Sequence, residues 1–105
     1  MHATLRRYEG VDQARSDELI AKVGETLLPR LSEVAGFAGY YLIDAGDGVM
    51  TSISLFETSA GATESTGLVG EWVREQELET ALPTPPTITS GPVIVHKNAR
   101  LLSAV

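Results

Sequence analysis

Three side chains in this sequence have the chemistry needed to hold a small acidic aromatic molecule: Trp72, Tyr41 and Arg7. A tryptophan ring offers a flat apolar wall, and a tyrosine hydroxyl can hydrogen-bond an oxygen of the molecule. A guanidinium favours the ionised form of a phenol by lowering its pKa. One hypothesis is therefore a ligand site between the second predicted helix and the sheet, with these three residues in its wall.

Each of the three residues also has a structural interpretation. Trp72 lies on the apolar stripe of its predicted helix, where a tryptophan packs in a core. Tyr40 and Tyr41 are neighbours in a predicted strand and must point to opposite faces of the sheet. Arg7 shares the face of Leu5, so it is either a partly buried ion-pair partner or an anchor for a phenolate or carboxylate. The sequence leaves both interpretations open.

His96 and two aspartates are the remaining candidates for catalysis or metal binding. His96 is the last residue of the last predicted strand and stands beside Lys97, with no carboxylate placed to orient it, which is typical of a surface histidine. Asp44 and Asp47 lie in a turn, where aspartate favours the backbone geometry. Cysteine is absent, and there is no phosphate-binding loop, dinucleotide-binding glycine pattern or HExxH motif. We therefore expect no metal, haem, flavin or nicotinamide cofactor.

The composition describes a globular protein that does not bind nucleic acids. The 105 residues suit one domain, 1–105, with residues 97–105 as a tail, and 43% of them are apolar. Fourteen acidic against eight basic residues give a net charge of −6, which excludes partners bound through phosphate groups, namely DNA, RNA and anionic membranes. No apolar run approaches the roughly 20 residues of a membrane span, so the cytoplasm is the expected compartment.

Hydrophobic periodicity predicts four strands and two helices. Strands are expected at residues 3–8, 37–43, 49–56 and 87–96, which are rich in β-branched, aromatic or other apolar residues. Apolar residues recur every three or four positions between residues 12 and 34, and again around Trp72. That spacing is typical of one apolar helical face.

Proline and glycine predict where these elements begin, break and end. Pro29 has no N–H for the helical hydrogen bond, so a kink or a restart is expected just before it. The second helix is expected to begin at a cap, Thr58 or Ser59, and its three glycines predict an irregular first half. The Gly91-Pro92 pair interrupts the last strand, which favours a position at the edge of the sheet.

This order of elements predicts an α+β fold of the ferredoxin-like βαββαβ type. Two right-handed crossovers place both helices on one face of a four-stranded antiparallel sheet and leave the other face bare. Residues 37–43 are apolar on both sides of their strand, so a second copy of the chain is expected to cover the bare face. The predicted assembly is a homodimer.

Five segments carry a pattern known from one protein family: RRYEGV (6–11), GFAGYYLID (36–44), SISLFET (52–58), EWVRE (71–75) and PPTITSGPVIVH (85–96). Together they resemble the dimeric α+β barrel proteins of the antibiotic biosynthesis monooxygenase (ABM) type, over almost the whole chain. The resemblance implies that two sheets pack face to face into a barrel. It also implies that each subunit can hold a hydrophobic pocket between its sheet and its helices.

The resemblance implies two chemistries. Haem-degrading members have a tryptophan where this chain has Trp72, but they also use an asparagine on the first strand and a histidine on the second helix, and this sequence has neither there. Members that oxidise polycyclic phenols to quinones without a cofactor use a tryptophan, a tyrosine and an arginine, for which Trp72, Tyr41 and Arg7 can stand. The helical asparagine of those members is missing here.

Two functions follow as hypotheses. One is a cofactor-independent monooxygenase, an oxidoreductase acting on a small aromatic or phenolic substrate. The alternative is a homodimer without catalytic activity that binds a small ligand or is purely structural. An RNA-recognition module has the same element order, but the negative charge and a third strand without a central aromatic residue exclude it. A cavity of about 300 Å³ or more with convergent polar groups would favour a ligand site over a filled core.

Overall fold

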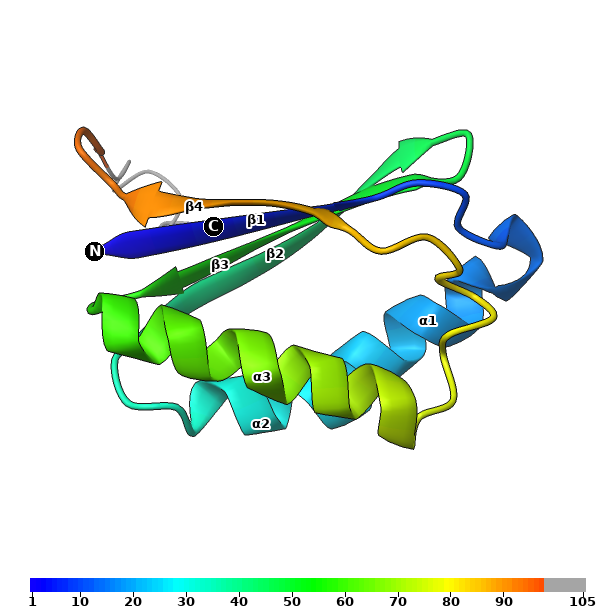
Figure 1. Cartoon of the computed structure of the whole chain (residues 1–105), viewed down its shortest axis with the longest axis horizontal. Helices are drawn as coiled ribbons and strands as arrows, with labels where there is room; N and C mark the ends of the chain where they lie inside the picture. The colour runs from blue at the N-terminus through cyan, green and yellow to red at the C-terminus, as the bar shows by residue number, and fades with distance from the viewer. Residues whose placement is uncertain (98–105) are drawn as a thin grey trace, which may run out of the picture.

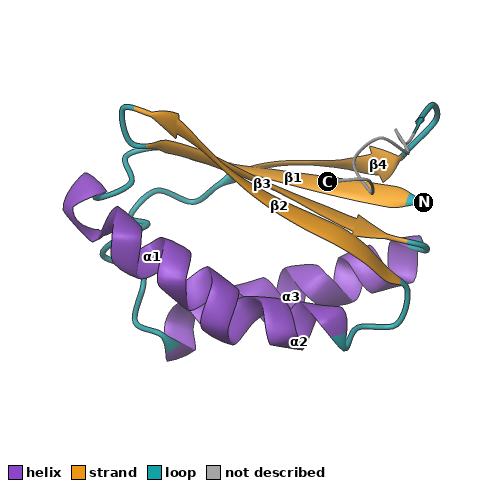
Figure 2. Cartoon of the chain, turned by 180° about the vertical axis from the view of Figure 1, so that it is seen from behind, coloured by secondary structure: helices purple, strands orange, loops and turns teal. Residues whose placement is uncertain are grey.

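The structure, a computed structural model, describes residues 1–97 and contains one four-stranded antiparallel sheet. Its strands are β1 (His2–Tyr8), β2 (Phe37–Gly46), β3 (Val49–Phe56) and β4 (Thr87–Pro92), in the spatial order β2-β3-β1-β4. The helices lie against one face of this sheet (Figure 1). Seen from behind, the opposite face carries none of the described helices (Figure 2). The predicted ferredoxin-like α+β fold is confirmed.

The first crossover is an interrupted helix, as its proline predicts. It consists of a short 3-10 turn η1 (Gln13–Arg15), α1 (Ser16–Lys22), a π-helical turn η2 (Val23–Leu27) and α2 (Leu28–Ser32). Pro29 cannot donate to the preceding turn, and the Leu28 N–H reaches the Val23 carbonyl five residues back. The expected restart at the proline is confirmed.

The second crossover helix, α3 (Ser59–Glu75), is continuous. Its cap is Thr58, whose side chain accepts a hydrogen bond from the Gly61 N–H at 3.2 Å. The expected irregular first half is wrong, because tight packing holds this part of the helix. A Cβ at Gly61 would lie 2.9 Å from the Ala35 carbonyl oxygen and 3.1 Å from the Phe56 ring, so glycine is what lets α3 approach its neighbours this closely.

The register of the sheet decides which side chains face the helices. Thr4 lies opposite Ser54, Arg6 lies opposite Ser52, and all four are buried beneath the helices. Leu5 points the other way, toward the outer face. The core between sheet and helices is formed by apolar side chains of both layers: Val11, Leu19, Val23, Leu27, Leu31, Val34, Met50, Phe56, Ala62, Val69, Trp72 and Leu78.

Strand β4 lies at the edge of the sheet beside β1, as the Gly91-Pro92 pair predicts. The strand ends at Pro92 and not at His96, because proline cannot donate a hydrogen bond to a ladder. Beyond it, the Val93 N–H donates to the Met1 carbonyl at 2.8 Å. Of the predicted tail 97–105, only residue 97 is among the described residues.

Candidate functional site

Within one chain the structure does not bring Trp72, Tyr41 and Arg7 together. Trp72 lies on α3 beneath the helix-facing side of the sheet, whereas Tyr41 and Arg7 point from the outer face. Tyr41 lies in one row across the sheet with Leu5, and it is 58% exposed. Arg7 forms an exposed ion pair with Glu9 at 3.2 Å. The expected common pocket is wrong for a single chain, because the sheet lies between Trp72 and the other two residues.

Trp72 is a core residue. Its side chain is 2% exposed, and its Nε1–H donates to the Thr26 hydroxyl at 2.7 Å. Thr26 lies in η2 and donates in turn to the Lys22 carbonyl at 2.7 Å. The cavity beside Trp72 measures about 30 Å³, which is room for about one water molecule. Of the two interpretations of this residue, the geometry supports core packing.

Arg6 carries a buried positive charge. It is 2% exposed, its Nη2 donates to the Thr66 hydroxyl at 2.9 Å, and its Nη1 donates to the Ser54 hydroxyl at 3.4 Å. Both partners are neutral, and within residues 1–97 no acidic side chain forms an ion pair with this guanidinium. A buried charge without a counter-ion is unfavourable by several kcal/mol. In the described part of the chain, Arg6 therefore has hydrogen-bond partners but no anion.

Beside Arg6 the surface opens into a groove of about 390 Å³, called here the Arg6 groove. It lies between β1, β4, the second half of α3 and the connector from α3 to β4, residues 76–86. Its size exceeds the lower limit of about 300 Å³ for small-molecule sites. The polar lining comes from Arg6, Tyr8, Thr66, Arg74, Glu79 and Thr84, and apolar side chains, among them Ile88 and three prolines of the connector, supply most of the rest.

Burial shifts the pKa of three groups around Arg6. Desolvation lowers the pKa of Arg6 itself, and the nearby Tyr8 and Tyr40 act in the opposite direction. Burial also raises the pKa of Tyr8. Burial, with a smaller contribution from Tyr8, raises the pKa of Tyr40 to about 12, against the opposing effects of Ser52 and Arg6. The two phenols therefore stay neutral at neutral pH and do not compensate the charge of Arg6.

The raised pKa of Tyr40 predicts a loss of stability in alkali. The folded state keeps this proton up to a pKa of about 12, whereas an unfolded tyrosine loses it near about 10. The stabilisation, about 2 to 3 kcal/mol, is complete below the unfolded pKa and disappears as the pH rises through the folded pKa. Urea unfolding between the two pKa values should show the free energy of unfolding falling with pH in wild type and in Tyr41→Phe. The free energy should fall less in Tyr40→Phe. Equal falls in all three proteins would contradict the assignment.

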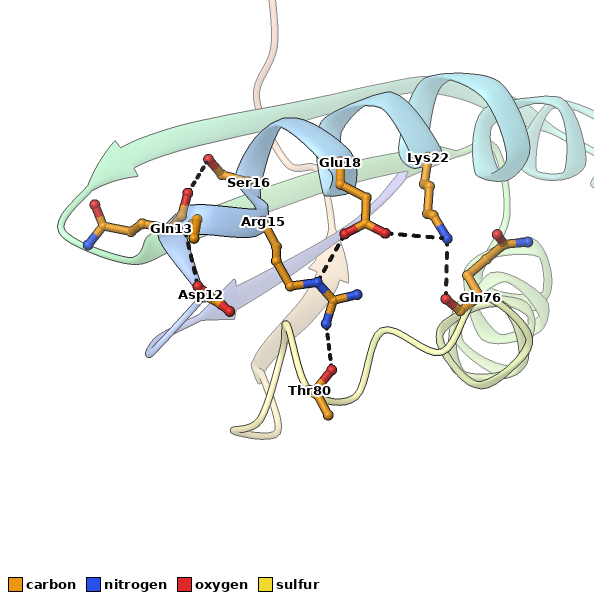
Figure 3. A network of polar contacts seen from close by, with 9 residues as sticks. Asp12, Gln13, Arg15, Ser16, Glu18, Lys22, Gln76 and Thr80 are labelled. Carbon is orange, nitrogen blue, oxygen red and sulfur yellow. Dashed lines mark hydrogen bonds and ion pairs between the residues drawn. The ribbon is translucent and has the colours of Figure 1, made fainter.

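A polar network fixes the connector that forms one wall of the Arg6 groove (Figure 3). Arg15 pairs with Glu18 at 3.0 Å and donates to the hydroxyl of Thr80 on the connector. Lys22 pairs with Glu18 at 3.8 Å and donates to the Gln76 carbonyl at 3.4 Å. The connector is thereby tied to the first helix, so the groove has a defined wall.

Arg6 and Tyr8 are site candidates that the sequence did not indicate. Alternation in β1 places Leu5 on the opposite face from both of them. Because Leu5 is apolar, the sequence suggests that its face is the one packed against the helices, and the structure shows the reverse. The signal that could have found them lies in β3. Its inward residues include Ser52 and Ser54, whose small side chains leave room for long ones on the neighbouring strands.

The polar chemistry of the groove comes from guanidinium, hydroxyl, phenol and carboxylate groups. Within residues 1–97 there is no group of three or more His, Cys, Asp or Glu side chains arranged to hold a metal ion. In the same part of the chain, no helix combines the length and the apolar character needed to cross a bilayer.

Solved structures resemble the chain over most of its length, although no protein-family model and no curated protein matches the sequence. A protein of unknown function from Nitrosomonas europaea has 19% identity and a TM-score of 0.69, with 93% of each chain covered. A monooxygenase from the ActVA-Orf6 gene of Streptomyces coelicolor, in complex with nanaomycin D, has 17% identity and a TM-score of 0.67, covering 93% of this chain and 92% of that one. A dimeric ferredoxin-like protein from an uncultured marine organism has 11% identity and a TM-score of 0.63, covering 93% and 97%.

Other matching structures are described as antibiotic biosynthesis monooxygenases. The chain has the ABM fold. The resemblance noted in the sequence is thus confirmed at the level of fold. Because one fold carries many activities, the fold alone does not identify the function of this ABM-like protein.

Proposed function

We propose that this ABM-like protein is a homodimer that binds a small acidic aromatic molecule in the Arg6 groove. The observation that carries the proposal is a buried guanidinium that has no ionic partner among residues 1–97, at an open groove of about 390 Å³. An anion in the groove would supply the missing counter-charge, and a flat apolar body would cover the proline and Ile88 side chains. Arg6 thus takes the part that the sequence suggested for Arg7.

The homodimer is proposed from the outer face of the sheet. Tyr41 is 58% exposed and Ile43 46% exposed on this face, and Leu5, Ile53 and Leu55 lie beside them. An exposed patch of large apolar side chains on a small domain favours association. A second copy fits best, because the same face on each copy gives a self-complementary contact of sheet on sheet. The marine structural neighbour is described as dimeric, which supports this choice.

Oxidation of a phenol by O₂ is the second candidate function. The positive charge of Arg6 in a partly apolar groove favours a ligand anion, and an ionised phenol is the electron-rich form that O₂ oxidises. In the balanced reaction, a phenol with a free para position and O₂ give a para-quinone and water. One oxygen atom of O₂ becomes the new carbonyl oxygen, and the other leaves as water with the hydroxyl hydrogen and the para hydrogen of the phenol. This reaction needs no metal or organic cofactor, and the neighbour from Streptomyces coelicolor is a monooxygenase.

Filling the groove tests the proposed site. Gly70 lines the groove, and a Cβ there would meet only the Arg74 guanidinium, at 3.7 Å. Gly70→Leu should fold, because leucine favours a helix more than glycine does, and it should weaken binding of bicyclic aromatic acids and phenols by at least about tenfold in calorimetry. Gly67→Leu is the matched control, because this position on the same helix has open space around it.

Oxygen uptake by the wild-type protein with each phenol then separates the two candidate functions. Binding with oxygen uptake and quinone formation supports the monooxygenase, and binding alone supports the protein without catalytic activity. Equal binding by Gly70→Leu and Gly67→Leu would place the ligand outside the groove and contradict the proposed site.

A further inference from the structure

We infer that the acidic group held by Arg6 is a carboxylate, so that the ligand class is the planar aromatic carboxylic acids. This inference rests on the proposed function, because it names the ligand of the same groove. Three features of the structure support it: the uncompensated charge, the donors left on the guanidinium and the apolar character of the remaining wall.

The charge of Arg6 needs a partner that is already an anion at neutral pH. A carboxylic acid with a pKa of about 4 is fully ionised there, whereas a phenol with a pKa of about 10 is neutral. Binding a phenol as its anion would require its pKa to fall by about 3 units, at the expense of binding energy. Two phenols of the protein itself, Tyr8 and Tyr40, lie near Arg6, and burial still raises the pKa of both above the usual value. The charge of Arg6 is therefore not enough to ionise a buried phenol at neutral pH.

The geometry of the guanidinium also favours two oxygens over one. Arginine has five N–H donors in a planar fork, and hydrogen bonds to the hydroxyls of Thr66 and Ser54 use two of them. The fork matches the two oxygens of a carboxylate, which is why such pairs are often bidentate. A phenolate offers a single oxygen.

The other charges of the groove are Arg74 and Glu79, both exposed. With Arg6 they make the groove positive by one charge, on a protein whose net charge is −6. Most of the remaining wall is apolar, including Val73 and Ile88. The groove therefore suits one anionic group on a flat apolar body, and Glu79 disfavours a ligand that carries a second anion near it.

Three bicyclic probes that differ in one group test this inference: 2-naphthoate, 2-naphthol and methyl 2-naphthoate. With the wild-type protein at neutral pH, calorimetry should show 2-naphthoate binding at least about 30-fold tighter than the other two. Arg6→Gln should lose at least about 30-fold of the affinity for 2-naphthoate, because the buried charge pair loses one partner. Arg7→Gln is the matched control, since it makes the same change on the next residue but on the outer face, and it should bind within about twofold of wild type.

The possible outcomes separate this inference from the proposed function. If 2-naphthol binds as tightly as 2-naphthoate and Gly70→Leu weakens both, the groove is the site but the carboxylate inference is wrong. Affinity for 2-naphthoate that is unchanged in a folded Arg6→Gln protein also overturns the inference. Absence of binding by all three probes, or binding that Gly70→Leu does not weaken, overturns both the inference and the proposed function. The comparison of probes on the wild-type protein stands even if Arg6→Gln does not fold.

Discussion

Replacing Trp72 by alanine is expected to lower the free energy of unfolding by about 3 to 5 kcal/mol. The indole is 2% exposed, so its removal leaves a large void beside a small cavity that already exists. The Thr26 hydroxyl also loses its 2.7 Å hydrogen bond from the indole N–H. Urea denaturation followed by far-ultraviolet circular dichroism measures the loss.

Trp72→Phe is the companion variant, because it keeps an aromatic ring in the core. It should lose less stability than Trp72→Ala, and its affinity for 2-naphthoate should stay within about twofold of wild type, since Trp72 does not line the Arg6 groove. A loss below about 1 kcal/mol in Trp72→Ala would contradict its place in the core. Greatly weakened ligand binding in a stable Trp72→Phe protein would indicate that the ligand binds at Trp72 and not in the Arg6 groove.

Replacing Ile43 by glutamate is expected to raise the dissociation constant of the proposed homodimer by at least about 100-fold. The symmetry of a dimer introduces the new charge twice, and each carboxylate would lie in an apolar contact without a cation to pair with. Sedimentation equilibrium at micromolar concentration should show a species near 11.2 kDa for Ile43→Glu and twice that mass for wild type.

Ile20→Glu is the matched control for this change. Ile20 lies on α1 and is 45% exposed, against 46% for Ile43, but it is on the helical side of the molecule. Ile20→Glu should remain a dimer. A wild-type protein that sediments as a monomer would contradict the homodimer, and dissociation of both variants alike would place the contact elsewhere.

The element order could be predicted from the sequence because short-range chemistry determines it. The spacing of apolar residues indicates both helices. Pro29 and the Gly91-Pro92 pair restrict the backbone at their own positions, whatever the tertiary structure. The irregular first half of α3 was a wrong prediction for a different reason. Helix propensity at Gly61 is a local quantity. The close approach that favours glycine there depends on contacts with Ala35 and Phe56, which lie outside the helix.

The choice of the buried face could not be made from one strand alone. β1 offers Leu5 and Arg7 on one side and Thr4 and Arg6 on the other, and hydrophobicity favours Leu5 as the inward residue. The structure has the opposite arrangement, because the sheet has two faces to cover and the proposed second copy would cover the outer, more apolar one. An interior position for Arg6 depends on partners on β3 and α3, and no local pattern in β1 encodes them.

The proposed carboxylate site at Arg6 can be seen directly in a crystal structure of the protein with 2-naphthoate, at ligand concentrations within about tenfold of the dissociation constant in solution. The carboxylate should lie about 2.8 Å from the guanidinium of Arg6, with the rings against Ile88 and the prolines of the connector. A ligand found beside Trp72 or on the outer face near Tyr41, with nothing bound at Arg6, would contradict it.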